Sequence, residues 1–181
     1  VTIDDNFINP GEIHIENAWD GSSKEPEYDA ATKTYKIKEA SELAWLADQV
    51  NGTTRAAANN FAGETFKLTK DINFNGERWT PIGLNADSPN KFSGIFDGQG
   101  HKIVNLVVDT EDGYTAAGLF GALNGTAKNF TIENAFIKHI STGDATDNGI
   151  AVVAGSIYNK GTIENVTVLN AVVEGNRYVG G

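Results

Sequence analysis

The sequence has no cysteine and no methionine, and its 181 residues include only 4 prolines beside 20 glycines. Without cysteine there is no disulfide framework, no thiolate nucleophile and no cysteine-based zinc site. This composition is compatible with an exported protein. The excess of glycine over proline is typical of a chain with many tight turns joined by uninterrupted hydrogen-bonded strands.

Positive charge is also scarce, because 14 Lys and Arg residues stand against 24 Asp and Glu residues, giving a net charge of −10. Such a chain is repelled by phosphate backbones and anionic membranes, so nucleic acid is not expected as a partner. No apolar run approaches the ~20 residues of a membrane span, and we expect no membrane insertion in this segment. Hydrophobic residues make up 40% of the chain, enough for one domain with a core.

What the sequence does have is an internal repeat. Residues 129–137 and 165–173 share Asn, Thr, Asn and Ala at matched positions, and their apolar residues also coincide. The two copies start 36 residues apart (129 to 165), and a weaker copy starts 24 residues earlier, at residue 105. Each copy follows a glycine-containing segment, at residues 94–100, 118–125 and 155–161. Repeats of this kind determine architecture before they determine function.

Within each unit, apolar and polar residues alternate over four to eight positions, which indicates short strands with one buried face. Units of roughly 24 residues without a helical crossover cannot form a core alone and must stack on their neighbours. No hexapeptide period is visible. The sequence therefore predicts an all-β fold, a right-handed parallel β-helix.

Stacking places like residues side by side. We predict that Asn105, Asn129 and Asn165 form a ladder at one corner, where their amides satisfy backbone groups of the turns. The predicted interior stacks consist of Ile103, Leu106, Phe130, Ile132, Ile137, Ile163, Val166, Val168 and Val173.

The N-terminal part is less regular. Residues 1–38 are predicted as an irregular lead-in with candidate strands at 13–15 and 35–37, and residues 39–181 as the repeat domain. Apolar residues at helical spacing predict a helix over 41–50, with Ser41 as N-cap and a stop at 51–52. We expect this helix to cover the N-terminal end of the solenoid, Trp45 to pack on residues 1–38, and residues 66–74 to form the first-coil strand. Residues 178–181 repeat the opening of earlier units, so we expect a truncated domain followed by further repeats or domains.

Several segments resemble one known family. Gly-Leu-Phe-Gly at residues 118–121 is similar to the motif that names the GLUG repeats of bacterial surface proteins. Further segments that resemble this family lie at residues 43–47, 68–72, 79–83 and 92–103, and the resemblance covers residues 35–181. It implies an exported, surface-anchored protein built from right-handed β-helical repeats, a type also found beside immunoglobulin A-specific metallopeptidases. The third unit departs from the motif at residues 153–157.

Catalytic patterns are weak. A metalloprotease needs His-Glu-x-x-His on a helix, and His14 with Glu16 lacks the second histidine. Asp97 and Asp71 are the carboxylates that a carbohydrate-active β-helix enzyme would use, but the signatures of polygalacturonase-like enzymes are missing. We interpret Asp97 as a turn cap beside Gly98 and Gly100, and His101, which has no obvious partner, as a turn or surface residue. The prediction is a protein without enzymatic activity and without catalytic residues.

Other candidates have simpler structural interpretations. Trp79 is expected to pack in the first coil rather than to bind a sugar, and His14, His101 and His139 are too scattered to form a ligand set. The acidic loops at 109–113 and 142–149 lack the spacing of a dedicated Ca²⁺ loop, so no metal or cofactor is predicted. Four Asn-x-Thr sequons are interpreted as turn chemistry rather than glycosylation sites; they begin at Asn51, Asn124, Asn129 and Asn165.

The predicted function is therefore a non-enzymatic, secreted or cell-surface module for adhesion or ligand display. Its binding residues are expected on loops 84–91, 109–117, 139–150 and 174–178. The expected partner is a host or matrix protein or a glycan, and Tyr114 beside Tyr178 would favour glycan stacking. A carbohydrate-active β-helix lyase or hydrolase and a purely structural spacer remain the alternatives.

Overall fold

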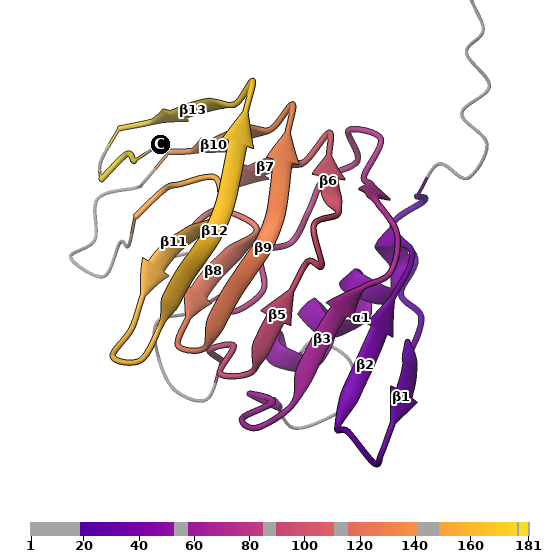
Figure 1. Ribbon diagram of the computed structural model, residues 1–181. Helices are drawn as coiled ribbons and strands as arrows, with labels where there is room; N and C mark the ends of the chain where they lie inside the picture. The colour runs from indigo at the N-terminus through magenta and orange to yellow at the C-terminus, as the bar shows by residue number, and fades with distance from the viewer. Residues whose placement is uncertain are drawn as a thin grey trace, which may run out of the picture.

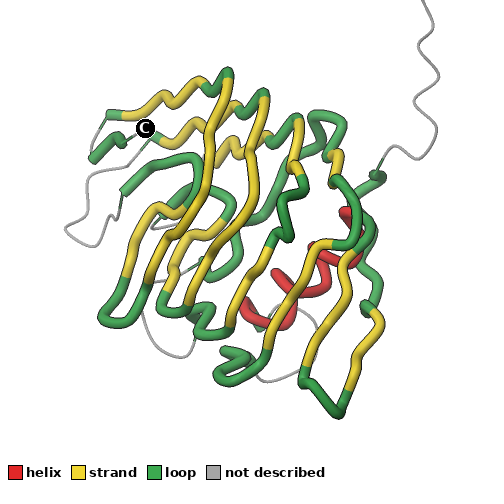
Figure 2. The backbone as a smooth tube through the Cα atoms, viewed as in Figure 1, coloured by secondary structure: helices red, strands yellow, loops and turns green. Residues whose placement is uncertain are grey.

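The computed structural model describes residues 19–52, 58–84, 90–110, 116–140, 149–176 and 178–180. These residues form thirteen β-strands and one α-helix, and every strand pair except the first runs parallel (Figure 1). The fold is all-β with parallel strands and one short helix. Figure 2 shows the longer strands lying side by side, with turns at both ends.

The chain enters this arrangement through a hairpin. β1 (Glu27–Asp29) pairs antiparallel with β2 (Thr34–Ile37), and β2 pairs in parallel with β3 (Thr65–Leu68). A candidate strand at 35–37 is thereby confirmed, whereas the one at 13–15 lies outside the described residues. The strand predicted over 66–74 is divided into β3 and β4 (Ile72–Asn73).

Three sheets receive strands from successive parts of the chain. The largest contains β5 (Ile95–Asp97), β6 (Lys102–Val104), β9 (Thr126–Glu133) and β12 (Thr162–Leu169) in addition to β1–β4. The second contains β7 (Val107–Thr110), β10 (Phe136–His139) and β13 (Val172–Gly175). The third contains β8 (Phe120–Leu123) and β11 (Ala154–Ile157). From β5 to β13 the chain visits the three sheets in a constant order.

The register gives the true length of the repeat. Ile72 pairs with Ile103, Ile103 with Ile132, and Ile132 with Val168, so stacked residues are 31, 29 and 36 positions apart (72 to 103, 103 to 132, 132 to 168). The 36-residue spacing agrees with the sequence repeat, but the 24-residue spacing is wrong. The reason is that β9 is long enough to pair with β5 through its first half and with β6 through its second half.

The only helix among the described residues is α1 (Ala40–Asn51). It begins one residue earlier than predicted, and the N-cap is Glu39 rather than Ser41. It ends as predicted, because Gly52 adopts a left-handed conformation (φ 69°) and donates its backbone N–H to Asp48 O at 2.9 Å. Within the described residues, no helix has the length and apolar character needed to cross a membrane.

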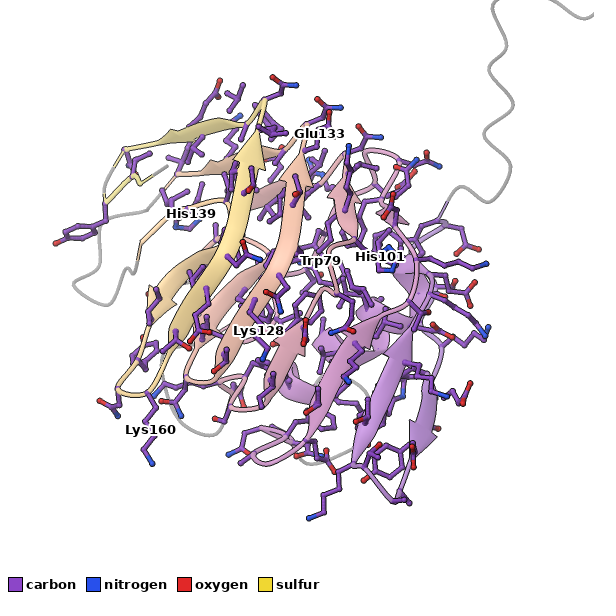
Figure 3. The ribbon with its side chains drawn as sticks, in the orientation of Figure 1. Trp79, His101, Lys128, Glu133, His139 and Lys160 are labelled. Atoms are coloured by element: carbon purple, nitrogen blue, oxygen red, sulfur yellow. The ribbon has the colours of Figure 1, made fainter. Side chains whose placement is uncertain are left out.

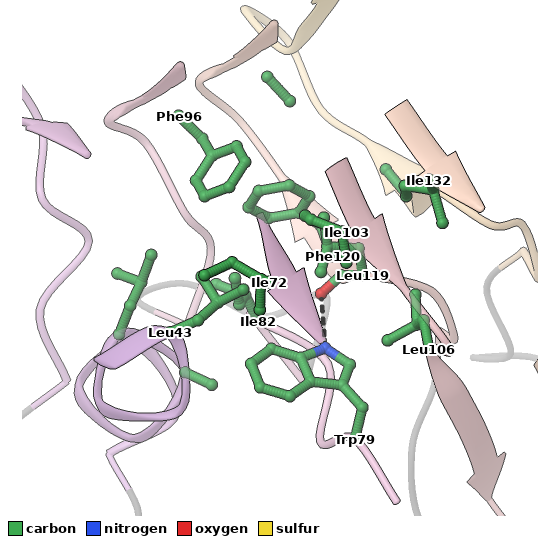
Figure 4. Close-up of a cluster of buried hydrophobic side chains, with 14 of the residues drawn as sticks. Leu43, Ile72, Trp79, Ile82, Phe96, Ile103, Leu106, Leu119, Phe120 and Ile132 are labelled. Carbon is green, nitrogen blue, oxygen red and sulfur yellow. Dashed lines mark hydrogen bonds between the residues drawn. The ribbon is translucent and has the colours of Figure 1, made fainter. Parts of the chain in front are cut away.

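A continuous buried cluster joins α1 to the three sheets (Figure 4). Leu43, Leu46 and Val50 of α1 are fully buried in it, and Trp45 packs against Tyr35 with ring centroids 5.6 Å apart. Trp79 lies inside the cluster as well, and its indole Nε1 donates to Leu119 O at 3.0 Å. The predicted packing roles of Trp45 and Trp79 are thus confirmed, and a sugar platform at Trp79 is excluded by its burial.

The predicted interior residues divide into two groups. Those before β12 are buried as expected: Ile103, Leu106, Phe130, Ile132 and Ile137. Val166, Val168 and Val173 are only partly buried against the cluster, and Ile163 is 38% exposed. Ile163 lies in the predicted column, since it pairs with the fully buried Ala127. Its assignment as an interior residue is nevertheless wrong, because no described strand covers its other side.

Candidate functional site

A polar groove of about 520 Å³ lies along β2 and β3. Its lining comes from the β1–β2 hairpin, from β3 and from the turn between β5 and β6: Asp29, Thr32, Thr34, Lys36, Lys67, Leu68, Thr69, Gln99 and His101. The chain forms this groove because β2, β3 and β5 stack in parallel, so that residues about thirty positions apart face the same side. Its polar groups are three hydroxyls, one amide, one imidazole, two ammonium groups and one carboxylate.

His101 has a partner that the sequence did not reveal. Its Nδ1 lies 3.1 Å from Asp71 Oδ1, and the same oxygen accepts the Lys102 backbone N–H at 2.9 Å. These contacts, the Lys102 N–H foremost, hold the pKa of the Asp71 carboxyl below its ordinary value. The expectation that His101 lacks a partner is therefore wrong. The two residues are thirty positions apart, and only the pairing of β4 with β6 brings them together.

Asp97 occupies the turn that the sequence predicts. Its Oδ1 accepts the Gln99 backbone N–H at 3.1 Å and Asn129 Nδ2 at 3.0 Å, and Lys128 Nζ lies 3.9 Å from Oδ2. Burial raises the pKa of the carboxyl, but these hydrogen bonds and the charge of Lys128 outweigh it and leave the pKa lowered. Asp97 and Asp71 have different partners: Asp97 is held by Gln99, Asn129 and Lys128, and Asp71 by His101 and Lys102 N.

Gly98 and Gly100 serve this turn in different ways. Gly100 has φ +84°, and the preceding Gln99 has φ 53°, so the left-handed backbone lies at 99–100. Gly98 is needed for space instead, because a Cβ there would collide with Phe130 and with the Asn129 carbonyl oxygen. The tight turn places Gln99 and His101 at the groove.

The asparagine ladder is confirmed for two of its three members. Asn165 Nδ2 donates to Asn129 Oδ1 at 3.0 Å, and Asn129 Nδ2 donates onward to Asp97. Asn105 belongs to a different column: it donates to Asn73 Oδ1 at 3.0 Å, and its backbone N–H bonds to Glu133 O. This correction follows from the 29-residue repeat, since the residue beside Asn105 is Asn134 (φ 58°) rather than Asn129.

The four sequon asparagines are engaged in the fold. Asn51 is buried, and its Nδ2 donates to Pro81 O while its Oδ1 accepts from the backbone of Gly83 and Leu84. Asn124 Nδ2 donates to Ser93 Oγ at 3.1 Å. Because the amide nitrogens of Asn129 and Asn165 also donate within the ladder, all four positions fit turn chemistry.

The predicted display loops are placed by the residues on either side of them. Thr110, His139 and Gly175 lie in register at the ends of β7, β10 and β13. Ala117, Ile150 and Val179, which follow the three loops along the chain, are joined by parallel bridges. Three successive loops therefore leave and return at neighbouring positions of one corner. Most of their residues lie outside the described ranges, including Tyr114 and residues 142–148 of the acidic segment, as do residues 85–89 and His14.

The remaining candidates do not converge. His139 is buried at the end of β10, and Figure 3 places it well apart from His101. In the ranges that the structure describes, no three His, Asp or Glu side chains gather in a way that could hold a metal ion. Tyr178 is 71% exposed beside the corner where the loops leave. The groove and the loop corner are thus the two places where the described chain offers binding groups.

One feature of the groove was missed by sequence reasoning. Lys36 and Lys67 are direct register partners, although each is an ordinary surface residue of an alternating segment. The recurrence of Tyr-Lys-Ile at 35–37 and Phe-Lys-Leu at 66–68 is the signal that could have aligned them.

Comparison with known proteins finds partial similarities. No protein-family model and no solved structure matches the chain. The chain is 36% identical over 152 residues to Halomucin of Haloquadratum walsbyi, covering 77% of this chain and 2% of that protein. It is 34% identical over 121 residues to a protein of Evansella cellulosilytica provisionally described as a Gly-rich membrane protein, covering 60% of this chain and 13% of that protein. The chain thus corresponds to a small part of each relative.

Proposed function

We propose that this chain is a segment of a cell-surface protein, a right-handed parallel β-helix of GLUG-like repeats that displays ligand-binding loops and has no enzymatic activity. The repeated visits to three sheets in constant order, with parallel register, support the solenoid. Right-handed crossover is the strong preference for parallel connections. A surface location is supported by the description of one relative as a membrane protein.

The observation that carries the proposal is the common corner of three loops. Solenoids use such positions for binding because the stacked strands fix the ends of each loop while its residues remain free to vary. The two segments outside the described residues, 111–115 and 141–148, differ in length and sequence, while their flanking residues keep the same register. A framework of constant register that carries loops of different length and sequence is the arrangement expected of a protein that displays ligand-binding loops. The expected ligands are host or matrix proteins or glycans.

A carbohydrate-active enzyme has one observation in its favour. A histidine held by a carboxylate is a general-base arrangement, and the Asp71–His101 pair lies at the polar groove. No nucleophile or second carboxylate contacts His101 within the described residues. Display without catalysis therefore accounts for more of the structure.

The test combines a glycan and matrix-protein array with a polysaccharide turnover assay. Residues 141–148 are replaced by a Gly/Ser sequence of equal length, and the control variant carries Asn159→Ser and Lys160→Ser in a turn at a different corner. Binding by the wild type and the control but not by the loop variant supports the proposal. Binding that survives the loop replacement argues against the loops as the binding site. Turnover that is abolished by His101→Gln establishes the carbohydrate-active enzyme. No binding and no turnover favours the purely structural spacer.

A further inference from the structure

The outer surface of the largest sheet carries a column of charged residues with one irregularity. Successive register partners along this column are Glu27, Lys36, Lys67, Asp97, Lys128 and Glu164. Every step joins opposite charges except the step from Lys36 to Lys67. Opposite charges on neighbouring strands are stabilising, whereas like charges directly opposite one another are destabilising.

A second column lacks this irregularity. On the sheet formed by β7, β10 and β13, Asp109, Lys138 and Glu174 follow one another in register. Arg78, whose own bridge partner is Val107, reaches this column from the neighbouring chain segment, and its Nη2 lies 3.2 Å from Asp109 Oδ2. Strict alternation is therefore attainable in this fold, and the Lys36–Lys67 step is a local departure from it.

The two lysines differ in their partners. Lys36 Nζ lies 2.6 Å from Glu27 Oε1 and is thus neutralised at the edge of the sheet. Lys67 is half-buried, and within the described residues no carboxylate lies within 4 Å of its ammonium group. Its other neighbour in the column, Asp97, is already held by Asn129, Gln99 and Lys128. Lys67 consequently offers a positive charge that the protein itself does not neutralise.

This charge faces the groove. Two carboxylates line or adjoin the groove and keep their charge: Asp29, whose Oδ1 accepts the Ala31 backbone N–H at 2.9 Å, and Asp71, which is bound to His101 and Lys102 N. Within the described residues, neither forms an ion pair with Lys67. Neutral hydrogen-bonding groups of the lining are the hydroxyls of Thr32, Thr34 and Thr69 and the amide of Gln99. The groove therefore combines the unpaired Lys67 and these neutral groups with the paired Lys36, and its one lining carboxylate, Asp29, belongs to the β1–β2 hairpin.

We propose that the groove binds an acidic saccharide, with the carboxylate or sulfate of one sugar unit against Lys67 and its hydroxyls against the threonine and glutamine side chains. A volume of about 520 Å³ lies in the range of small-ligand sites. A polyanion such as nucleic acid is disfavoured by the net charge of −10. This site is separate from the loop corner, so it can be present whether or not the loops bind anything.

The experiment measures binding of digalacturonic acid to the full chain by isothermal titration calorimetry at low salt. The parallel ligands are its methyl ester, which has the same shape without the charge, a sulfated disaccharide and inorganic sulfate. We expect the acid to bind about tenfold more tightly than the ester, and affinity to fall as salt rises. Comparison of the carboxylated and sulfated sugars identifies the source of the oxyanion, and sulfate alone shows how much the sugar hydroxyls contribute.

Two variants decide the role of the lysine. Lys67→Gln should weaken binding of the acid by roughly tenfold and leave the ester unaffected. Lys160→Gln, at the turn before β12 and distant from His101 in Figure 3, should bind like the wild type. Lys67→Gln removes one like-charge neighbour, Lys36, and one opposite-charge neighbour, Asp97, so the two effects offset each other and the variant should melt close to the wild type. An unchanged melting temperature then shows that misfolding does not explain a loss of binding. Equal affinity for acid and ester, an unchanged Lys67→Gln affinity, or no binding of any probe would each overturn the proposal.

Discussion

Residues 129–137 and 165–173 are nearly the same sequence, yet β9 and β12 have very different surroundings. β9 pairs on one side with β5 and β6 and on the other with β12, whereas β12 pairs only with β9 among the described strands. Ile132 and Ile137 are fully buried, while their counterparts Val168 and Val173 are only partly buried. An identical pattern therefore gives a core strand or a half-covered strand according to its neighbours. In a stacked fold, burial is a property of the position in the stack.

The strongest way to break this comparison is to place a charge in each strand, at a buried position of β9 and at an exposed position of β12. Ile132→Asp buries a carboxylate in the middle of the stack, and we expect it to lower the free energy of unfolding by more than ~4 kcal/mol and to abolish cooperative folding. Ile163→Asp changes a side chain that is 38% exposed and should cost no more than about 1 kcal/mol. Thermal unfolding followed by circular dichroism compares the two. Equal losses would contradict the assignment of β12 as the half-covered strand.

A smaller effect is expected from the glycines that precede the two strands. Gly125 and Gly161 are equivalent, because Thr126 pairs with Thr162. A Cβ at Gly125 would collide with the backbone of Ser93 and Gly94. At Gly161 it would meet Ile157 Cγ2 at 2.5 Å and Leu123 O at 2.7 Å, a less severe collision.

We therefore expect Gly125→Ala to cost roughly 2–3 kcal/mol and Gly161→Ala somewhat less, because both sites become overpacked but the collision at Gly161 is less severe. Urea titration of both variants with unchanged m-values would give the difference directly. A greater loss at Gly161 would show that the half-covered end is packed more rigidly than its burial indicates.

Much of the fold was predictable because its signals are local. Alternating apolar residues predict the strands, and helical spacing with Gly52 predicts α1 and its end. The register was less accessible, because it depends on pairs about thirty residues apart. The similar context of Asn105 and Asn129 predicts that they align, but the length of β9 places Asn105 beside Asn134. The error arose where two short strands oppose one long one.

The candidate site was predictable only in part, for the same reason. Asp97 as a turn cap follows from its own neighbours, Gly98 and Gln99. Neither the contact of His101 with Asp71 nor the pairing of Lys36 with Lys67 has a local signal, since each joins residues from different turns of the chain. Function in this molecule therefore rests on the non-local part of the structure, which composition and spacing do not specify.

The β1–β2 edge of the largest sheet can be compared with its β12 edge through the dependence of stability on pH. At the β1–β2 edge, Tyr35 is covered by Tyr28 and stacks on Phe66 with ring centroids 4.5 Å apart. Burial, followed by the nearby charge of Glu64, raises the pKa of Tyr35 from 10.0 to about 12. Because the folded pKa is above the unfolded value, the stabilisation is complete below pH 10 and is lost as the pH rises towards 12.

We expect this loss to amount to about 1–2 kcal/mol, allowing for solvent near the half-buried ring. Tyr35→Phe cannot ionise, so its unfolding free energy should decline less between pH 10 and 12 than that of the wild type. Lysines and other tyrosines titrate in both proteins and cancel in the difference. Identical alkaline profiles would mean that Tyr35 is as solvated in the folded chain as in the unfolded one.

The smallest expected difference lies in the asparagine ladder itself. Asn129 donates to Asp97 and accepts from Asn165, whereas Asn165 makes only one of these two bonds. Both have positive φ, 58° and 50°, so substitution by glycine keeps the backbone conformation and removes the side chain alone. Asn129→Gly should then cost about 1–2 kcal/mol, because it also leaves part of the Asp97 carboxylate unpaired, and Asn165→Gly about 0.5–1 kcal/mol.

Since Asn165 contacts Asn129 directly, the double variant should lose less than the sum of the two single losses. If the loss of unfolding free energy in the double variant equals the sum of the two single losses, the ladder bonds act independently. Strand pairing in register, rather than the chain of amide hydrogen bonds, would then align the two copies.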